Sequence, residues 1–184
     1  EEKINTDSFL PISLSLSHNE KGVSYALKQN LNSSLAEFIV GSQLDPDLSV
    51  LNCNLAFIYL LKEDIELSND YIKKARKLNK CMDIVYLNEG LLFYKNNNLN
   101  SALKCFQESL KYNPNNLHAK YNLSMIYFLT DNIQLSFKYI SELAPYGLFY
   151  IYIQRHFRYL DKSVLDVTQW VSPRESYAFQ EYII

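Results

Sequence analysis

Apolar side chains recur along this chain at the spacing of amphipathic helices, and the helices recur in pairs. Between residues 82 and 112, bulky apolar residues stand three and four positions apart on both sides of the polar run Asn96–Asn98. This spacing is typical of two helices joined by a tight turn. Pro114 ends the second helix, because proline disfavours helical geometry in the residue before it. The stretch Asp83–Asn116 therefore predicts a helix, a turn and a helix.

The same pattern returns every 34 residues. Five columns of positions keep their character in four successive copies. They hold a large aromatic residue, a small residue in each helix, an apolar residue after the turn, and a large apolar residue in the second helix. The columns are Tyr25, Tyr59, Phe93 and Tyr127; Gly22, Ala56, Gly90 and Ser124; Ser34, Ser68, Ala102 and Ser136; Leu31, Ile65, Leu99 and Ile133; and Phe38, Ile72, Phe106 and Ile140. The agreement identifies a repeat protein, in which stacked helix pairs share one core.

The period and the spacing of small and aromatic residues resemble tetratricopeptide repeats. Leu44-Asp45-Pro46 and Tyr112-Asn113-Pro114 resemble the closing signature of that family. The resemblance covers about Ser15 to Leu148, roughly three quarters of the chain. It implies an all-α, right-handed superhelical solenoid of about four helix pairs with one concave face.

Three parts are predicted along the chain. Residues 1–16 are expected to form an N-terminal lead-in arm, extended or loosely docked. Four repeats follow at about 17–47, 48–81, 82–115 and 116–147, and a capping box at 17–20 begins the first helix. Residues 148–184 are expected to form a C-terminal helical cap, because this segment is too apolar to be a solvated tail. The expected helices of the repeats span about 18–29, 33–44, 48–61, 65–79, 82–95, 99–112, 116–129 and 132–144.

Charge and composition narrow the classes of function. A net charge of −2 gives no electrostatic reason to expect nucleic acid. No run of about 18 apolar residues predicts a transmembrane segment. The cysteines Cys53, Cys81 and Cys105 form no close pair, which argues against a disulfide framework and slightly favours the cytoplasm. The chain starts without Met, so an upstream targeting segment or domain could be missing, and the compartment is left open.

The chain offers no recognisable catalytic or metal-binding constellation. His18, His118 and His156 fall in different predicted helices, and no HExxH pair, glycine-rich phosphate loop or serine nucleophile elbow is found. The protein is therefore predicted to be no enzyme and to need no cofactor or metal. The basic run Lys73–Lys80 is interpreted as the solvated end of a helix, where cations complement the helix dipole, with an anion or nucleic-acid site as the alternative.

The resemblance directs attention to the first helix of each repeat, which lines the concave face in this family. Asn54, Asn88 and Asn122 stand 34 residues apart on these helices. An amide both donates and accepts, so a row of three suits an extended peptide backbone; the alternative is that the amides support helix packing. The predicted groove residues are Asn54, Phe57, Asn88, Leu91, Tyr94, His118, Tyr121, Asn122, Met125 and Phe128.

The groove is predicted to be apolar, and this bears on the kind of partner. Family members that clamp the C-terminal carboxylate of heat-shock chaperones use Lys and Arg here, whereas only Lys95 stands near the matching positions. That clamp is therefore not expected. The predicted function is a scaffold or adaptor that binds an extended peptide or amphipathic helix of another protein. The alternatives are the repeat region of a larger enzyme, a structural subunit that self-associates through its C-terminal cap, and a groove filled by the chain's own tail.

Overall fold

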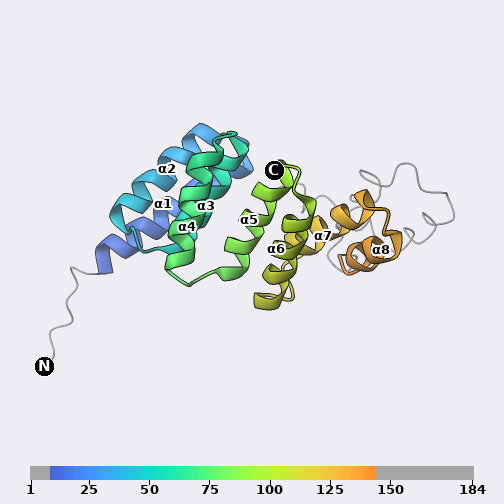
Figure 1. The fold of residues 1–184 in the computed structure, drawn as a ribbon. Helices are drawn as coiled ribbons and strands as arrows, with labels where there is room; N and C mark the ends of the chain where they lie inside the picture. The colour runs from blue at the N-terminus through green and yellow to red at the C-terminus, as the bar shows by residue number, and fades with distance from the viewer. Residues whose placement is uncertain (1–8, 144–184) are drawn as a thin grey trace, which may run out of the picture.

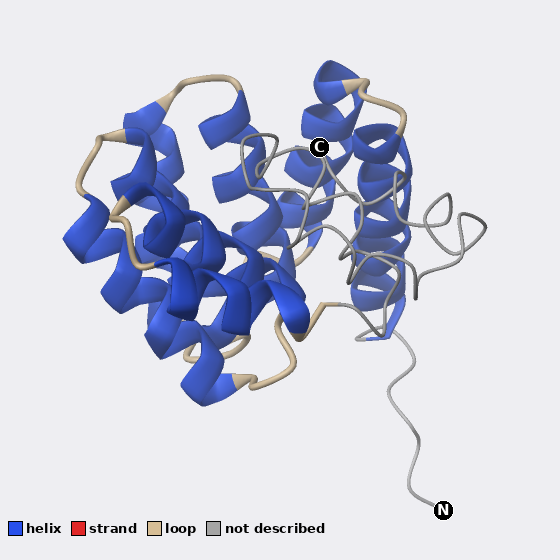
Figure 2. Ribbon diagram, turned by 90° about the vertical axis from the view of Figure 1, so that its right-hand side faces the viewer, coloured by secondary structure: helices blue, strands red, loops and turns tan. Residues whose placement is uncertain are grey.

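The hydrophobic periodicity of the sequence is realised as helices. The computed structural model describes residues 9–143, so residues 1–8 of the predicted arm and the predicted cap at 148–184 lie outside the described residues. Within residues 9–143 there are eight helices and no strand (Figure 2). The helices are α1 (Phe9–Leu27), α2 (Leu31–Leu44), α3 (Ser49–Leu61), α4 (Ile65–Lys77), α5 (Met82–Lys95), α6 (Leu99–Tyr112), α7 (Leu117–Leu129) and α8 (Ile133–Ser141).

The helices form four successive pairs. Each odd-numbered helix packs mainly against the even-numbered helix that follows it, and the pairs succeed one another along the molecule (Figure 1). The bounds of α2 to α8 lie within about three residues of the bounds expected from the hydrophobic pattern. The predicted all-α solenoid of helix pairs is confirmed.

The first helix begins earlier than predicted. α1 starts at Phe9 instead of near residue 18, so Phe9–Leu16 is helical and its predicted extended conformation is wrong. Pro11 stands in the first turn, where its missing N–H has no intrahelical partner to lose. Ser15 is fully buried, and its Oγ donates a 3.0 Å hydrogen bond to the Gly41 carbonyl of α2. Packing on α2 therefore overrides the local pattern, and the predicted capping box at 17–20 lies inside α1.

Within each pair, one residue of the first helix is matched in size to one residue of the second. The first and third pairs combine glycine with phenylalanine, whereas the second and fourth combine alanine or serine with isoleucine. A Cβ at Gly90 would stand 2.5 Å from the ring of Phe106, so only glycine fits there. The combinations are Gly22 with Phe38, Ala56 with Ile72, Gly90 with Phe106, and Ser124 with Ile140.

Stacked tyrosines accompany the isoleucines. Tyr59 stacks on Tyr71 with ring centroids 5.5 Å apart, and Tyr127 stacks on Tyr139 at 5.8 Å. The first and third pairs hold other combinations at these positions. Those combinations are Tyr25 with Glu37 and Phe93 with Cys105. The backbone thus repeats with every pair, whereas the packing of the core repeats with every second pair.

A common turn joins the two helices of every pair. One residue adopts the left-handed conformation, with φ between 58° and 66°. The next residue is always Asn or Asp, and its side chain accepts a hydrogen bond from the backbone N–H three residues on. This column is a sequence signal that the five columns above leave out. The left-handed residues are Gln29, Glu63, Asn97 and Asp131, and the capping residues are Asn30, Asp64, Asn98 and Asn132.

Neighbouring pairs share buried side chains. Leu51 of α3 packs with Phe38 of the first pair, and Val85 of α5 packs with Cys53 and Ile72 of the second pair. These contacts pack each helix pair against the next. They bring the first helices of the pairs together on one side. No helix between residues 9 and 143 is long and apolar enough to cross a membrane.

Candidate functional site

The first helices of the four pairs surround a cavity of about 330 Å³. Residues from α1, α3, α5 and α7 line it, and Phe38 of α2 also contributes. Most of these residues are apolar, and the polar groups are three asparagine amides, one imidazole and one phenol. The lining residues are Val23, Ala26, Leu27, Phe38, Cys53, Asn54, Phe57, Ile58, Ile84, Leu87, Asn88, Leu91, His118, Tyr121 and Asn122.

Most of the residues predicted for the groove stand at this cavity. Tyr94, Met125 and Phe128 do not line it. Each of these three stands about one turn or more closer to the C-terminal end of its helix than the lining residues of the same helix. The predicted residues around the cavity are Asn54, Phe57, Asn88, Leu91, His118, Tyr121 and Asn122. Their part in binding stays a prediction.

The predicted groove residues include none from the first repeat, which contributes Val23, Ala26 and Leu27 to the cavity. Val23 stands 34 residues before Phe57 and 68 before Leu91, so the repeat register itself contains the signal for it. Phe38 and Ile58 are different, because both are almost completely buried and have the ordinary appearance of core residues. No periodic pattern in the sequence indicates that they border a cavity.

The three asparagine amides donate hydrogen bonds within the chain. Asn88 is 3% exposed, and its Nδ2 donates to the backbone carbonyl of Cys53 over 2.9 Å, which connects α5 to α3. Asn54 Nδ2 donates to Asn19 Oδ1 over 2.7 Å. Asn122 Nδ2 donates to the carbonyl of His118 in its own helix over 2.8 Å. The hydrogen bond of Asn88 Nδ2 therefore belongs to helix packing. The Oδ1 atoms of the three asparagines are the amide atoms left to bind a ligand.

Asn88→Ala should lower the free energy of unfolding by about 1–2 kcal/mol, because it removes a buried hydrogen bond between repeats. Asn122→Ala is the matched control and should change stability by less than about 0.5 kcal/mol, since its bond is local and alanine favours the helix. Urea titration followed by circular dichroism measures both. Equal effects at the two positions would contradict the role of Asn88 in joining α3 to α5.

The cavity is electrically neutral. The described residues that line it include no Lys, Arg, Asp or Glu. Lys95 stands nearby, but its Nζ is 3.0 Å from Glu63 Oε1 and 3.4 Å from the Leu60 carbonyl. Desolvation lowers the pKa of His118 below its usual 6.5, although the residue is exposed at the surface. The imidazole is thus neutral at pH 7.

The cysteines in and near the site have the properties of core residues. Burial raises the pKa of Cys53 to about 12. Burial, followed by the nearby carboxylate of Glu89, raises the pKa of Cys105 to about 12. A thiol needs its thiolate form to act as a nucleophile or metal ligand, so neither side chain is set up for that chemistry. Cys81 lies between α4 and α5 and is exposed. Residues 9–143 contain no group of three potential metal ligands.

The comparison with known families decides the identity of the repeats. The sequence model of the tetratricopeptide repeat matches residues 84–116, which correspond to most of α5, all of α6 and the turn that follows. Residues 84–116 therefore form a tetratricopeptide repeat. The matched pair is the third of four, and the other pairs share its turn and its 34-residue register.

Several solved structures have the same fold, and some of them are tetratricopeptide repeat domains. The first such domain of human RPAP3 has a TM-score of 0.57 and 24% identity, covering 67% of this chain and 97% of its own. The first repeat domain of Spaghetti (RPAP3), solved with the HSP90 peptide SRMEEVD, has a TM-score of 0.56 and 23% identity, with coverages of 65% and 95%. PilW, a type IV pilus biogenesis factor, has a TM-score of 0.62 and 14% identity, and covers 90% of both chains. No curated protein matches the sequence.

Proposed function

We propose that this protein is a non-catalytic interaction module that holds an apolar helix or peptide of a partner protein in the cavity between its first helices. The observation that carries the proposal is the uncharged cavity of about 330 Å³, lined from all four pairs. An apolar concavity of this kind gains free energy when apolar side chains of a ligand replace water. Similar domains of RPAP3 were solved with peptides of HSP90 and HSP70, which supports the use of this fold for peptide binding.

The walls of the cavity favour a ligand with several apolar anchors in a row. Val23, Phe57 and Leu91 occupy one register position in three successive repeats, and all three line the cavity. An amphipathic helix presents apolar residues at intervals of three and four, and a groove lined by successive repeats can take several of them. The oxygens of Asn54 and Asn122 would then accept hydrogen bonds from polar groups at the edge of the ligand.

A ligand that ends in an acidic peptide fits this cavity poorly. The chaperone peptides in the similar structures are SRMEEVD and SGPTIEEVD, and both carry acidic residues next to the chain end. Desolvated carboxylates require cationic partners. The cavity offers none among its described lining residues, and Lys95 is already paired with Glu63. We therefore assign to the cavity a ligand whose inserted face is uncharged.

Photocrosslinking tests the proposal and identifies the occupant. Phe57 is replaced by the photoreactive residue benzoylphenylalanine, which keeps an aromatic ring in the cavity. The control carries the same residue in place of Val40, which is 40% exposed on α2 and does not line the cavity. In extract of the native source, the probe at Phe57 should crosslink a partner protein that the probe at Val40 does not reach.

A charge placed in the cavity gives an independent readout. Val23→Glu should weaken capture of that partner by about tenfold or more, because a carboxylate would be desolvated without a counter-ion. Val40→Glu is matched in residue type and nearly in exposure, with exposed fractions of 38% and 40%, and should leave capture unchanged. Crosslinks from Phe57 to residues 144–184 of the same molecule would instead assign the cavity to the chain's own tail. Crosslinks to a second copy would assign it to self-association.

A further inference from the structure

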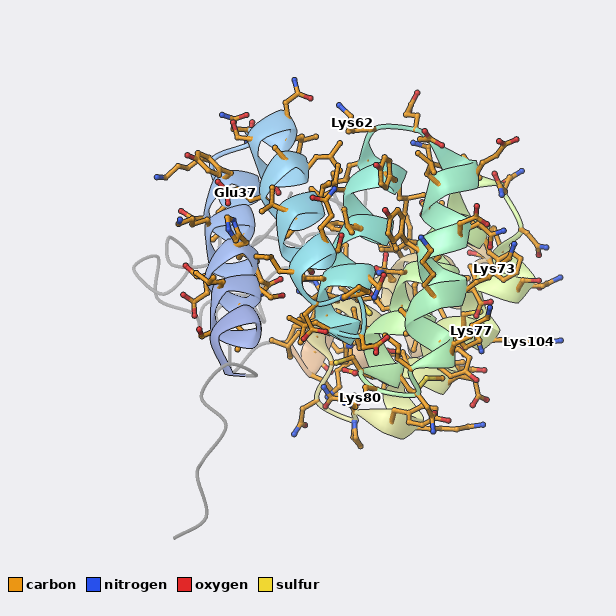
Figure 3. The ribbon with its side chains drawn as sticks, turned by 90° about the vertical axis from the view of Figure 1, so that its left-hand side faces the viewer. Glu37, Lys62, Lys73, Lys77, Lys80 and Lys104 are labelled. Atoms are coloured by element: carbon orange, nitrogen blue, oxygen red, sulfur yellow. The ribbon has the colours of Figure 1, made fainter. Side chains whose placement is uncertain are left out.

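The helices on the outside of the solenoid carry a concentration of lysines that the groove does not use. Residues 71–111 contain eight Lys or Arg and three Asp or Glu, whereas the whole chain has a net charge of −2. Four of these lysines define what we call the outer lysine face: Lys73 and Lys77 on α4, Lys80 just after it, and Lys104 on α6. Figure 3 shows Lys73, Lys77 and Lys104 gathered at one side of the molecule, away from Glu37.

The contact between α4 and α6 is made through α5. The carboxylate of Glu89 on α5 binds the guanidinium of Arg76 on α4, and it also lies 3.6 Å from the Sγ of Cys105 on α6. Lys77 follows Arg76 in sequence and Lys104 precedes Cys105, so both lysines flank this junction. Figure 3 shows the two lysines on the same side of the molecule.

These lysines have little compensation from the protein itself. Lys77, Lys80 and Lys104 have no acidic partner within 4 Å among the described residues. Lys73 pairs with Asp70 over 3.4 Å, but both side chains are more than 60% exposed, and such a pair contributes little. Lys73 and Lys77 follow the i, i+4 spacing of one face of α4, and Lys80 lies three residues beyond the end of that helix. The result is a short row of solvated positive charges with Lys104 beside it.

We infer that the outer lysine face binds an acidic segment of a partner protein, at a site separate from the cavity. Charge complementarity selects an acidic ligand, and the spacing of Lys73 and Lys77 along α4 suits a helix with carboxylates at i and i+4. Arg76 is the one arginine within residues 71–111, and it already has partners in the protein. It binds Glu89 and lies 4.8 Å from the ring centroid of Tyr86. Only lysines remain, without the planar fork that recognises phosphate bidentately. The sequence pI of about 5.9 also differs from the strongly basic character of nucleic-acid-binding domains.

A synthetic acidic helix tests this inference on the intact protein. The probe is a fluorescein-labelled 14-residue peptide, about 21 Å long as a helix, with Glu at i, i+4, i+7 and i+11 and Ala or Gln elsewhere. The comparison peptide carries Gln in place of each Glu. Fluorescence anisotropy at low and physiological salt should show binding of the acidic peptide only, weaker at higher salt.

Variants locate the site. Lys77→Glu/Lys104→Glu should weaken binding of the acidic peptide by about tenfold or more, since two attractions become repulsions. Lys28→Glu/Lys62→Glu changes the net charge by the same amount at exposed lysines away from this face, and should reduce binding by less than about twofold. Circular dichroism confirms that both variants are folded.

Three results would overturn the inference. Equal weakening in the two double variants would mean that only net charge matters. Equal binding of the Gln peptide would exclude charge recognition. The protein could also bind single-stranded oligouridine or phosphatidylserine vesicles more tightly than the acidic helix. If Lys77→Glu/Lys104→Glu abolished that binding, the face would be reassigned to nucleic acid or to a lipid surface.

Discussion

Replacing Gly90 by alanine should lower the free energy of unfolding by about 2 kcal/mol, although alanine is the better helix former. The new Cβ would lie 2.5 Å from Cε1 and 2.7 Å from Cδ1 of Phe106, whose side chain is fully buried in the core. Overpacking of a core costs about 1–3 kcal/mol, and contacts this short belong at the upper end of that range. The gain in helix propensity is about 1 kcal/mol, so the loss prevails.

The same substitution should be tolerated once the partner is changed as well. Phe106→Ile alone leaves a cavity and should cost about 1–2 kcal/mol. Gly90→Ala/Phe106→Ile reproduces the combination of Ala56 and Ile72 in the second repeat. The double variant should therefore be more stable than the sum of the two single effects predicts.

Urea titration of the four proteins gives the coupling free energy directly. Ser124→Ala serves as the control, because the same register position already carries a Cβ there, and its stability should change by less than about 0.5 kcal/mol. Additive effects in the cycle would show that the glycine and the phenylalanine are not fitted to each other.

Ellman's reagent should react rapidly with one cysteine of the folded protein and slowly with two. Cys81 is exposed, whereas burial raises the pKa of Cys53 and of Cys105 to about 12. At pH 8, a thiol with that pKa has about a thousandfold less thiolate than an ordinary thiol of pKa about 8.5. The reaction of the two buried thiols should therefore be at least about a hundredfold slower.

The absorbance of the released product, followed with time, counts the fast and slow thiols. In concentrated guanidinium chloride all three should react rapidly, and Cys81→Ser should remove the fast phase from the folded protein. Two or three fast thiols in the native protein would mean that the core around Cys53 or Cys105 opens on the timescale of the assay.

Most of the fold can be predicted from the sequence, because the same pattern of residues recurs in every helix pair. Small residues, aromatics and turn residues recur in register, so an error at one position is corrected by the other copies. The start of α1 is the exception, since it is fixed by a tertiary contact, Ser15 with the carbonyl of Gly41, that no periodic pattern encodes. Local reasoning from Pro11 and the alternating serines therefore leads to the wrong structure.

The candidate site is only partly contained in the sequence. The register places Phe57, Leu91 and Tyr121 on one side of the solenoid, but it does not give the depth or length of the cavity. Those depend on how Phe38 and Ile58 pack. The asparagine column shows a second limit, because Asn88 bonds to a backbone oxygen of Cys53, and backbone acceptors leave no mark on a sequence.

The core alternates between two combinations, glycine with phenylalanine and alanine or serine with isoleucine. This alternation restricts how the gene can gain or lose repeats. A recombination event within the turn between two helices joins the first helix of one repeat to the second helix of another. A slip of one repeat would set Gly22 against Ile72 and leave a void, or set Ala56 against Phe106 and create a clash. A slip of two repeats would join partners of the same kind. Duplications and deletions that break inside a pair should therefore persist in steps of two repeats, whereas breaks between pairs are free of this rule.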